Sequence, residues 1–205
     1  MQEFVFNSFV TLLVVVDPLG LAPIYAALTQ GYSEKRRREA AIRGTILGSV
    51  ILFVFALVGD VLLDALGITL PAFRIAGGML LFLLALDMIF ARPSGMRSRS
   101  IQEQEEDDFE ADVSVFPLAI PLLAGPGAIT TVLLYTGGRS PAEVGVFAAV
   151  LLVVLFLTLA SLLLASRVMR LFGETGSNVL SRVLGVLLAA LAVQFVLDGL
   201  QASLA

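Results

Sequence analysis

The sequence predicts an all-α, polytopic membrane protein with six transmembrane helices, arranged as two inverted three-helix repeats in which helices 1 and 4 are broken. Hydrophobic residues make up 58% of the 205 residues and charged residues only 15%, which is far more apolar than a soluble domain. Six apolar stretches reach the roughly 20 residues that a bilayer requires. A shift of 108 residues (126 − 18) carries Pro18 onto Pro126 and Gly77 onto Gly185, and this offset favours an internal duplication.

The six apolar stretches are too long and too uniformly apolar for barrel strands, so we expect helices. They cover residues 4–28, 44–66, 70–90, 114–136, 144–166 and 180–200. The chain accordingly divides into a first three-helix repeat (1–91), an acidic cytoplasmic linker (92–112) and a second three-helix repeat (113–205). A charge run such as this linker is usually a solvated segment.

Basic residues indicate the orientation. Eleven of them share one predicted side of the membrane: Lys35, Arg36, Arg37, Arg38, Arg43, Arg92, Arg97, Arg99, Arg167, Arg170 and Arg182. Only Arg74 and Arg139 fall on the other side, so the positive-inside rule predicts that both termini lie outside the cytoplasm. Three spans per half is an odd number, which inverts the second repeat relative to the first.

The first span should break near its middle. Pro18 has no amide hydrogen to donate, and Pro23 repeats the problem one turn later. Asp17 then stands at a natural N-cap with Pro18 at the first helical position, which favours a new helix. For Asp17, a purely structural cap and a proton or ammonium site both fit.

The fourth span should break as well. Pro117, Pro121 and Pro126, with Gly125 and Gly127, make a continuous helix hard to maintain, and we expect a second half-helix to begin near Gly127. Paired broken segments at corresponding places in two halves are a sequence-level pointer to the substrate site of a secondary transporter. A proline in either segment alone would more often mean only a kink.

Each restart is expected to leave unpaired backbone amides, which bind anions. They lie around Leu19, Gly20 and Leu21 in one copy and around Gly127, Ala128 and Ile129 in the other. Asp17 can satisfy the first set, whereas the matching Gly125 has no side chain. This asymmetry suggests a zwitterionic solute.

In this hypothesis the solute's carboxylate docks at residues 127–129 and its ammonium approaches Asp17 and the carbonyls near Val14. The predicted substrate-binding residues are Asp17, Pro18, Gly20, Leu21, Gly125, Pro126, Gly127, Ala128, Ile129, Thr130 and Thr131. Asp17 and Asp87 are the candidates for coupling to a proton or another ion. We expect Gly127→Val to abolish substrate binding while the protein still folds.

The chain has no Cys, His or Trp, and so offers no thiolate nucleophile, no Cys/His zinc set and no imidazole base. We expect no metal, no cofactor, no nucleic acid and no enzymatic activity.

The strings Val16-Asp-Pro-Leu-Gly-Leu-Ala-Pro23 and Pro117-Leu-Ala-Ile-Pro-Leu-Leu-Ala-Gly-Pro-Gly127 resemble the MarC family of integral membrane proteins. Ser33-Glu-Lys-Arg-Arg-Arg38, Ala76-Gly-Gly78 and Gln194-Phe-Val-Leu-Asp-Gly199 extend the resemblance over essentially the whole chain. It implies a six-span protein of the bacterial inner membrane, related to SnatA-type carriers of small neutral amino acids such as alanine and glycine, driven by an ion gradient.

Two positions depart from the family pattern. Leu21 stands where the family commonly has Asn, and Ala76 stands where it has Ser, so both changes remove polar atoms. If these positions contact the solute, they favour a more apolar one.

Three functions from different classes follow. The first is a transporter or exporter of small neutral amino acids that alternates access to a midplane site in the bilayer, with a proton or Na⁺ as suspected coupling ion and a homo-oligomer possible. The second is an intramembrane enzyme that uses Asp17 with Asp87, although these should lie too far apart. The third is a channel or a membrane subunit that does not transport.

Overall fold

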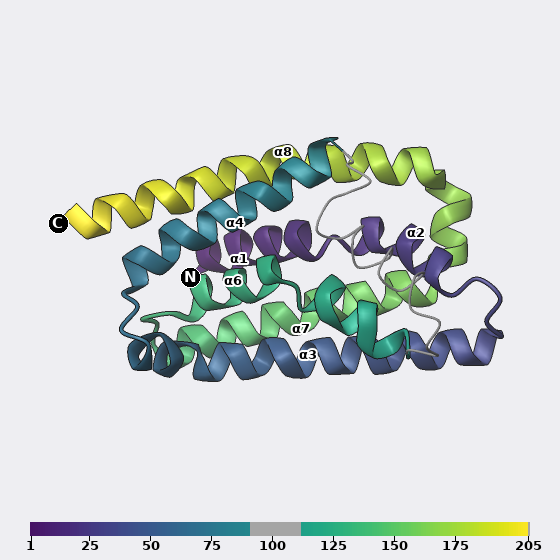
Figure 1. The fold of residues 1–205 in the computed structure, drawn as a ribbon, viewed down its shortest axis with the longest axis horizontal. Coiled ribbons are helices and arrows are strands. Elements are labelled where there is room, and N and C mark those ends of the chain that lie inside the picture. The colour runs from purple at the N-terminus through teal and green to yellow at the C-terminus, as the bar shows by residue number, and fades with distance from the viewer. Residues whose placement is uncertain (91–111, 205) are drawn as a thin grey trace.

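The computed structural model describes residues 1–90 and 112–204, whose helices run along the length of the molecule (Figure 1). In chain order they are α1 (Gln2–Val16), α2 (Pro18–Leu28), α3 (Glu34–Ala65), α4 (Leu70–Phe90), η1 (Ser114–Leu123), α6 (Pro126–Thr136), α7 (Pro141–Leu163) and α8 (Ala165–Leu204). The predicted linker lies outside the described residues except for Asp112.

The described helices contain five segments that are long and apolar enough to cross a membrane. A sixth is obtained if η1 and α6, which are bent by 51° at their junction, count as one span. The chain is therefore all-helical and multi-pass in the part that the structure describes, and its apolar stretches are where the sequence predicts them.

Two helix boundaries differ from prediction. α3 begins at Glu34 rather than near residue 44, because Ser33 caps it by accepting a hydrogen bond from the Arg36 amide (3.3 Å) and the first turns are polar. α8 begins at Ala165, directly after α7, and breaks at Gly173, whose φ of 62° suits glycine. Its first part turns across the end of the bundle before the rest runs back along α4 (Figure 1).

α4 and α8 pack against each other in opposite directions, and glycines bring them close. A Cβ built on Gly78 would lie 2.7 Å from the Ala192 carbonyl oxygen, and one on Gly185 would lie 2.9 Å from the Met88 Cβ. Both positions therefore require the absence of a side chain, and they serve helix packing.

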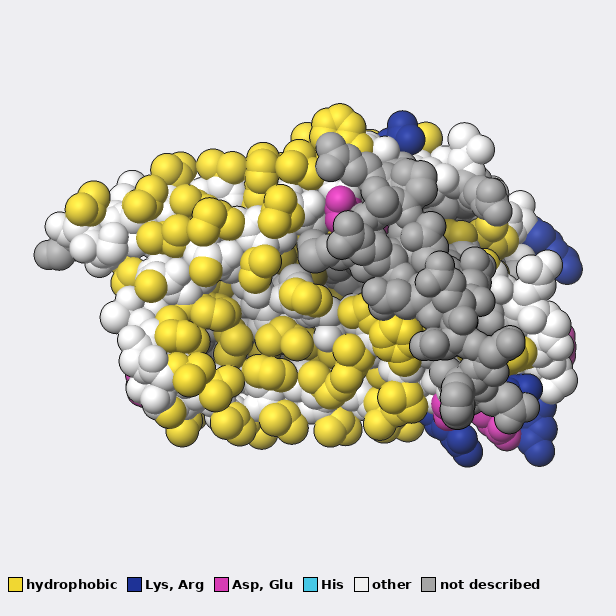
Figure 2. All heavy atoms as spheres, in the orientation of Figure 1, with side chains coloured by type: hydrophobic (Ala, Val, Ile, Leu, Met, Phe, Trp, Pro, Cys, Tyr) yellow, Lys and Arg dark blue, Asp and Glu magenta, His cyan; other side chains and the backbone are white. Residues whose placement is uncertain are grey.

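The outer surface matches a lipid environment. Figure 2 shows hydrophobic side chains over the length of the bundle, with Lys and Arg gathered near one end. The most exposed large hydrophobic residues on the long helices include Leu57, Val61, Phe156 and Val186. Both chain termini lie at the end away from the start of α3 (Figure 1). That this end faces away from the cytoplasm remains a prediction.

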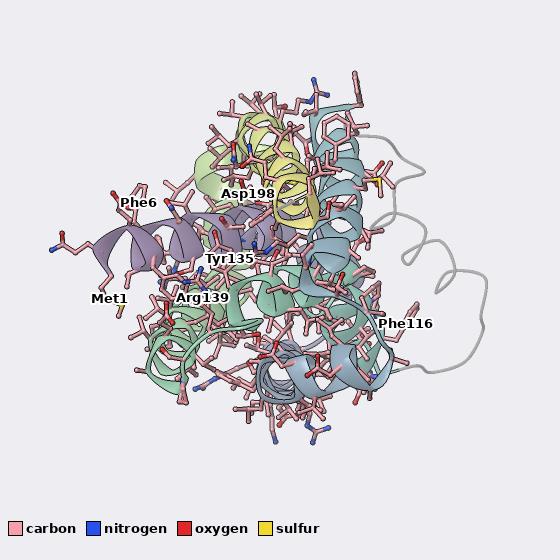
Figure 3. The ribbon with its side chains drawn as sticks, turned by 90° about the vertical axis from the view of Figure 1, so that its left-hand side faces the viewer. Met1, Phe6, Phe116, Tyr135, Arg139 and Asp198 are labelled. Carbon is pink, nitrogen blue, oxygen red and sulfur yellow. The ribbon has the colours of Figure 1, made fainter. Side chains whose placement is uncertain are left out.

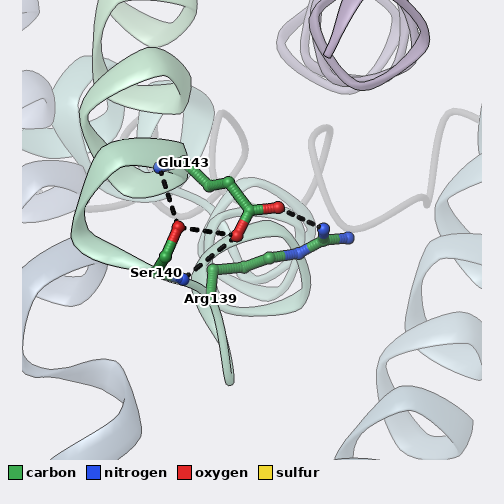
Figure 4. A network of polar contacts seen from close by, with 3 residues as sticks. All are labelled: Arg139, Ser140 and Glu143. Atoms are coloured by element: carbon green, nitrogen blue, oxygen red, sulfur yellow. Dashed lines mark hydrogen bonds and ion pairs between the residues drawn. The ribbon is translucent and has the colours of Figure 1, made fainter.

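At the terminus-bearing end, the α6–α7 turn is tied down by polar contacts. Ser140 and Glu143 form a capping box at the start of α7, and Arg139 pairs with Glu143 at 2.8 Å (Figure 4). The Gly138 amide also donates to the Asp60 carboxylate at 3.2 Å, so the turn is joined to α3.

Candidate functional site

Asp17 forms the joint between α1 and α2. Its φ of 51° and ψ of 66° are left-handed, a conformation that Asp tolerates better than most residues. Its amide closes α1 on the Leu13 carbonyl, and its Oδ1 accepts a hydrogen bond from the Gly20 amide at 3.0 Å. The predicted break and the predicted N-cap are both confirmed, and the side chain is only 1% exposed.

Three serines from the second half of the chain bond to this joint. Ser181 Oγ donates to Asp17 Oδ2 at 2.9 Å. Ser161 Oγ donates to the Pro18 carbonyl at 2.7 Å, and Ser177 Oγ donates to the Leu19 carbonyl at 2.9 Å. The joint of the first half is thus satisfied by α7 and α8.

The contact from Ser177 has a clear physical cause. In an α-helix the Leu19 carbonyl would accept the amide hydrogen of residue 23, but Pro23 has none. The serine hydroxyl supplies the missing donor. Sequence reasoning missed these serines. Ser177 and Ser181 are four residues apart and so share one helix face, which is the signal that could have drawn attention to them.

The segment before the second break departs from a regular helix. Phe116 and Ile120 have extended backbones (φ −128° for both, ψ 128° and 124°), as expected for residues that precede proline. Both proline peptide bonds in the segment are cis. Wider turns replace the α-helical bonds, with the Ala124 amide bonded to the Ala119 carbonyl at 2.9 Å. The fourth span is therefore interrupted, as predicted.

α6 begins at Pro126, one residue before the predicted start, and its N-cap Gly125 makes no side-chain cap. The backbone amides of Gly127 and Ala128 make no hydrogen bond to any residue that the structure describes. The Ile129 amide, however, donates to the Gly125 carbonyl at 3.0 Å. The expectation that Ile129 offers a free amide is therefore wrong, because Ile129 is the fourth residue after the N-cap Gly125, and its amide makes the first hydrogen bond of the helix.

The same correction applies to the first copy, where the Leu21 amide donates to the Asp17 carbonyl at 3.0 Å. The asymmetry between the two copies nevertheless stands. The Gly20 amide has a carboxylate cap, and the equivalent Ala128 amide has none.

A small cavity of about 40 Å³ lies at the uncapped start of α6. It is lined by Val15, Leu84, Pro121, Leu122, Gly125, Pro126, Gly127 and Ala128. This volume holds little more than one water molecule. Its side chains are apolar, so backbone groups supply the polar chemistry.

The structure brings together only part of the predicted site. Four of the predicted residues, Gly125 to Ala128, line the cavity, and α1 contributes Val15. The predicted residues of the first copy surround the serine-bonded joint instead. Thr131 donates to the Gly127 carbonyl at 2.8 Å, so its hydroxyl is engaged inside its own helix.

The remaining predicted residues lie outside the cavity. Thr130 directs its methyl group at Gly77 of α4, and Asp87 is half-buried on the same helix. Of the two departures from the family pattern, Leu21 is buried, whereas Ala76 is exposed on α4 and has no part in the cavity.

Gly127 is tightly packed. A Cβ there would lie 2.7 Å from Leu84 Cδ2 and 3.5 Å from Leu81 Cδ2. Gly127→Val would therefore disturb helix packing as well as the cavity, so it cannot separate binding from folding as the sequence alone suggested.

Tyr135 links α6 to α1 inside the bundle, where Figure 3 shows it from the end with the termini. Its hydroxyl bonds to Thr11 Oγ1 at 2.9 Å, and its ring stacks on Phe147 with centroids 5.6 Å apart. The buried hydroxyl is thus satisfied while α1, α6 and α7 are joined.

A family model described as MarC family integral membrane protein matches residues 2–204. The chain belongs to the MarC family. Among its relatives, a UPF0056 membrane protein of Archaeoglobus fulgidus is 37% identical over 206 residues, covering 97% of this chain and 92% of the relative. UPF0056 membrane protein YvbG of Bacillus subtilis is 34% identical over 204 residues (98% and 96%), and YhcE of Escherichia coli is 31% identical over 198 residues (96% and 91%).

No solved structure matches this MarC protein. The names of these relatives state membrane residence and no activity. The family resemblance and the multi-pass membrane location are therefore confirmed, with bacterial proteins among the relatives, while amino-acid transport stays a prediction.

Proposed function

We propose that this MarC protein is a secondary transporter or exporter of small neutral amino acids, such as alanine and glycine, and not an enzyme. The observation that carries the proposal is the cavity at the uncapped amides of Gly127 and Ala128. Helix N-termini favour anions, and discontinuous helices inside a membrane present them to the carboxylate of a solute. At about 40 Å³ the cavity is too small to hold an amino acid, so transport requires the two halves to move apart around it.

The two halves are proposed to be inverted repeats. α2 and α6 each have 11 residues, and both their first and their last residues are separated by the same 108 positions (126 − 18 and 136 − 28). Ser33 and Ser140 cap the helices that follow. α2 and α6 start near the middle of the molecule and run in opposite directions (Figure 1), which supports alternating access around a central site.

Asp17 is the proposed coupling residue, and Asp87 the second candidate. Asp17 is buried near the midpoint of the first span, where a charged carboxylate is costly unless it is paired or protonated. Val15, two residues before Asp17, lines the cavity. A change in the protonation or ion binding of Asp17 could therefore shift α1 and alter the cavity in which the solute is proposed to bind. The coupling ion would be a proton or Na⁺.

The decisive experiment is uptake of labelled alanine or glycine by liposomes that contain the purified protein, with and without proton or sodium gradients. We expect saturable uptake that depends on one gradient. Unsaturable flux would indicate a channel, and no flux under either gradient would contradict the proposal.

A second experiment tests the coupling role with Asp17→Asn. Asn is as good an N-cap as Asp, so the protein should fold. Counterflow of solute should persist while gradient-driven uptake is lost. Gradient-driven uptake at the wild-type rate would remove Asp17 from the coupling mechanism.

A further inference from the structure

A second kind of cavity opens where α3 begins and α7 ends, at the end of the bundle opposite the termini. Its volume is about 350 Å³, and it is lined by Glu34, Arg37, Arg38, Leu162 and Leu163. α3 supplies the charged side and α7 the apolar side. The cavity therefore suits an amphipathic ligand, with a charged group on the α3 side and an apolar group on the α7 side.

The charged side has an excess of positive charge. It holds two guanidinium groups and one carboxylate, and in the described chain no ion pair within 4.0 Å engages Arg37 or Arg38. The ion pair that the structure does show, between Arg139 and Glu143, lies at the other end. One carboxylate cannot neutralise two guanidinium groups, and neighbouring guanidinium groups are suited to a phosphate, which they bind through paired hydrogen bonds.

The apolar side faces lipid. Leu163 is 41% exposed, and the next residue, Leu164, is 43% exposed. Hydrophobic side chains cover the bundle up to the end where Lys and Arg gather (Figure 2). A ligand in this cavity can place its anion on α3 while a hydrocarbon chain follows α7 into the bilayer.

A larger cavity of about 530 Å³ at the other side of the α3 start provides a contrast. It holds Lys35, Arg36 and Arg43, but also Glu39 and Asp112. Ser114 donates to the Asp112 carboxylate from its hydroxyl (2.7 Å) and its amide (3.1 Å), and these bonds hold the pKa of Asp112 below its usual range. The two cavities differ in their apolar side: leucines line the smaller cavity, and none lines the larger one.

We propose that the smaller cavity binds an anionic phospholipid, with the phosphodiester on Arg37 and Arg38 and an acyl chain along the exposed Leu163. Basic pockets between transmembrane helices are known to accept such head groups, and each basic residue near the surface adds to the affinity. The site lies at the bundle end and is independent of the proposed transport activity.

The test is native mass spectrometry of the purified protein with phosphatidylglycerol or phosphatidylcholine. The wild type should retain phosphatidylglycerol in preference. The double variant Arg37→Gln/Arg38→Gln should weaken that binding roughly thirtyfold. The matched control Lys35→Gln/Arg36→Gln removes the same charge from the same helix turn but lines the other cavity, and it should keep the preference.

Folding is not at risk in the test variant, because the contact of Arg37 with the core is made by its backbone carbonyl, which accepts a hydrogen bond from the Tyr25 hydroxyl. Leu163→Gln should also weaken phosphatidylglycerol binding. Equal losses in both double variants would overturn the proposal, because they would show only general attraction of anions. Displacement of the lipid by inorganic phosphate at similar concentration would overturn it too, since the acyl chain would then contribute nothing.

Discussion

At the scale of single residues, Asp17 shows how far the sequence leads. Its neighbour Pro18 predicts the break, and short polar side chains predict the cap, so the joint could be placed from local chemistry alone. What the sequence did not predict is that Ser181, 164 residues later, completes the carboxylate's hydrogen bonds. A contact of this kind depends on how α8 packs, which no local pattern encodes.

Ser181→Ala should destabilise the protein by about 1–3 kcal/mol, because it leaves a buried carboxylate oxygen without its hydroxyl donor. Thermal unfolding in detergent measures the effect. Ser203→Ala is the control: the same helix carries this exposed serine, whose hydroxyl bonds only to the Leu200 carbonyl, and its melting temperature should not change. Equal melting temperatures for the two variants would show that the hydrogen bond from Ser181 adds no stability.

Leu84→Ala removes one wall of the small cavity. We expect the cavity to grow and uptake of valine to rise relative to alanine, at a cost in stability of about 2–5 kcal/mol. Competition between labelled alanine and larger neutral amino acids gives the readout. Leu83→Ala, on the lipid-facing side of the same helix at 53% exposure, should leave selectivity unchanged. The same ratio of valine to alanine uptake in both variants would show that the solute does not bind in the cavity beside Leu84.

At the scale of elements, apolar length predicts the spans well but predicts their ends poorly. α3 begins almost three turns before its apolar stretch, because a helix that leaves the bilayer needs only a cap and good helix formers. α8 begins directly after α7 although the segment around Arg167 and Arg170 is polar. Prolines, by contrast, predicted both interruptions, since a missing amide acts locally.

The role of Ser177 at the broken helix can be tested with a double-mutant cycle. Ser177→Ala alone should cost about 1 kcal/mol, because the Leu19 carbonyl loses its donor. In a Pro23→Ala background the cost should shrink, since residue 23 regains an amide that can reach the same carbonyl. Equilibrium unfolding of the four proteins measures the coupling. Additive effects would mean that the serine does not replace the proline's missing donor.

At the scale of the whole molecule, the matching bounds of α2 and α6 agree with a duplication that the sequence offset already suggested. The site is less predictable: the sequence grouped both breaks into one binding site, whereas the structure puts the α6 amides at a cavity and Asp17 in a serine-bonded joint. That separation comes from the packing of α4, α7 and α8 around the breaks.

The orientation can be tested directly, because the chain contains no cysteine and introduced ones give no background. Ser203→Cys should react with a membrane-impermeant thiol reagent in intact cells. Lys35→Cys should react only after the cells are permeabilised. The reverse pattern would invert the predicted orientation without altering the fold.

The hydroxyl bonds to the first joint would have one further consequence for the proposed transport cycle. All three acceptors belong to the N-terminal half and all three donors to the C-terminal half, so any rocking of one half against the other must break them together. In a water-poor interior each rupture costs on the order of 1 kcal/mol or more. In the proposed transport cycle, these bonds would slow the return of the protein without its solute and so limit loss of the ion gradient.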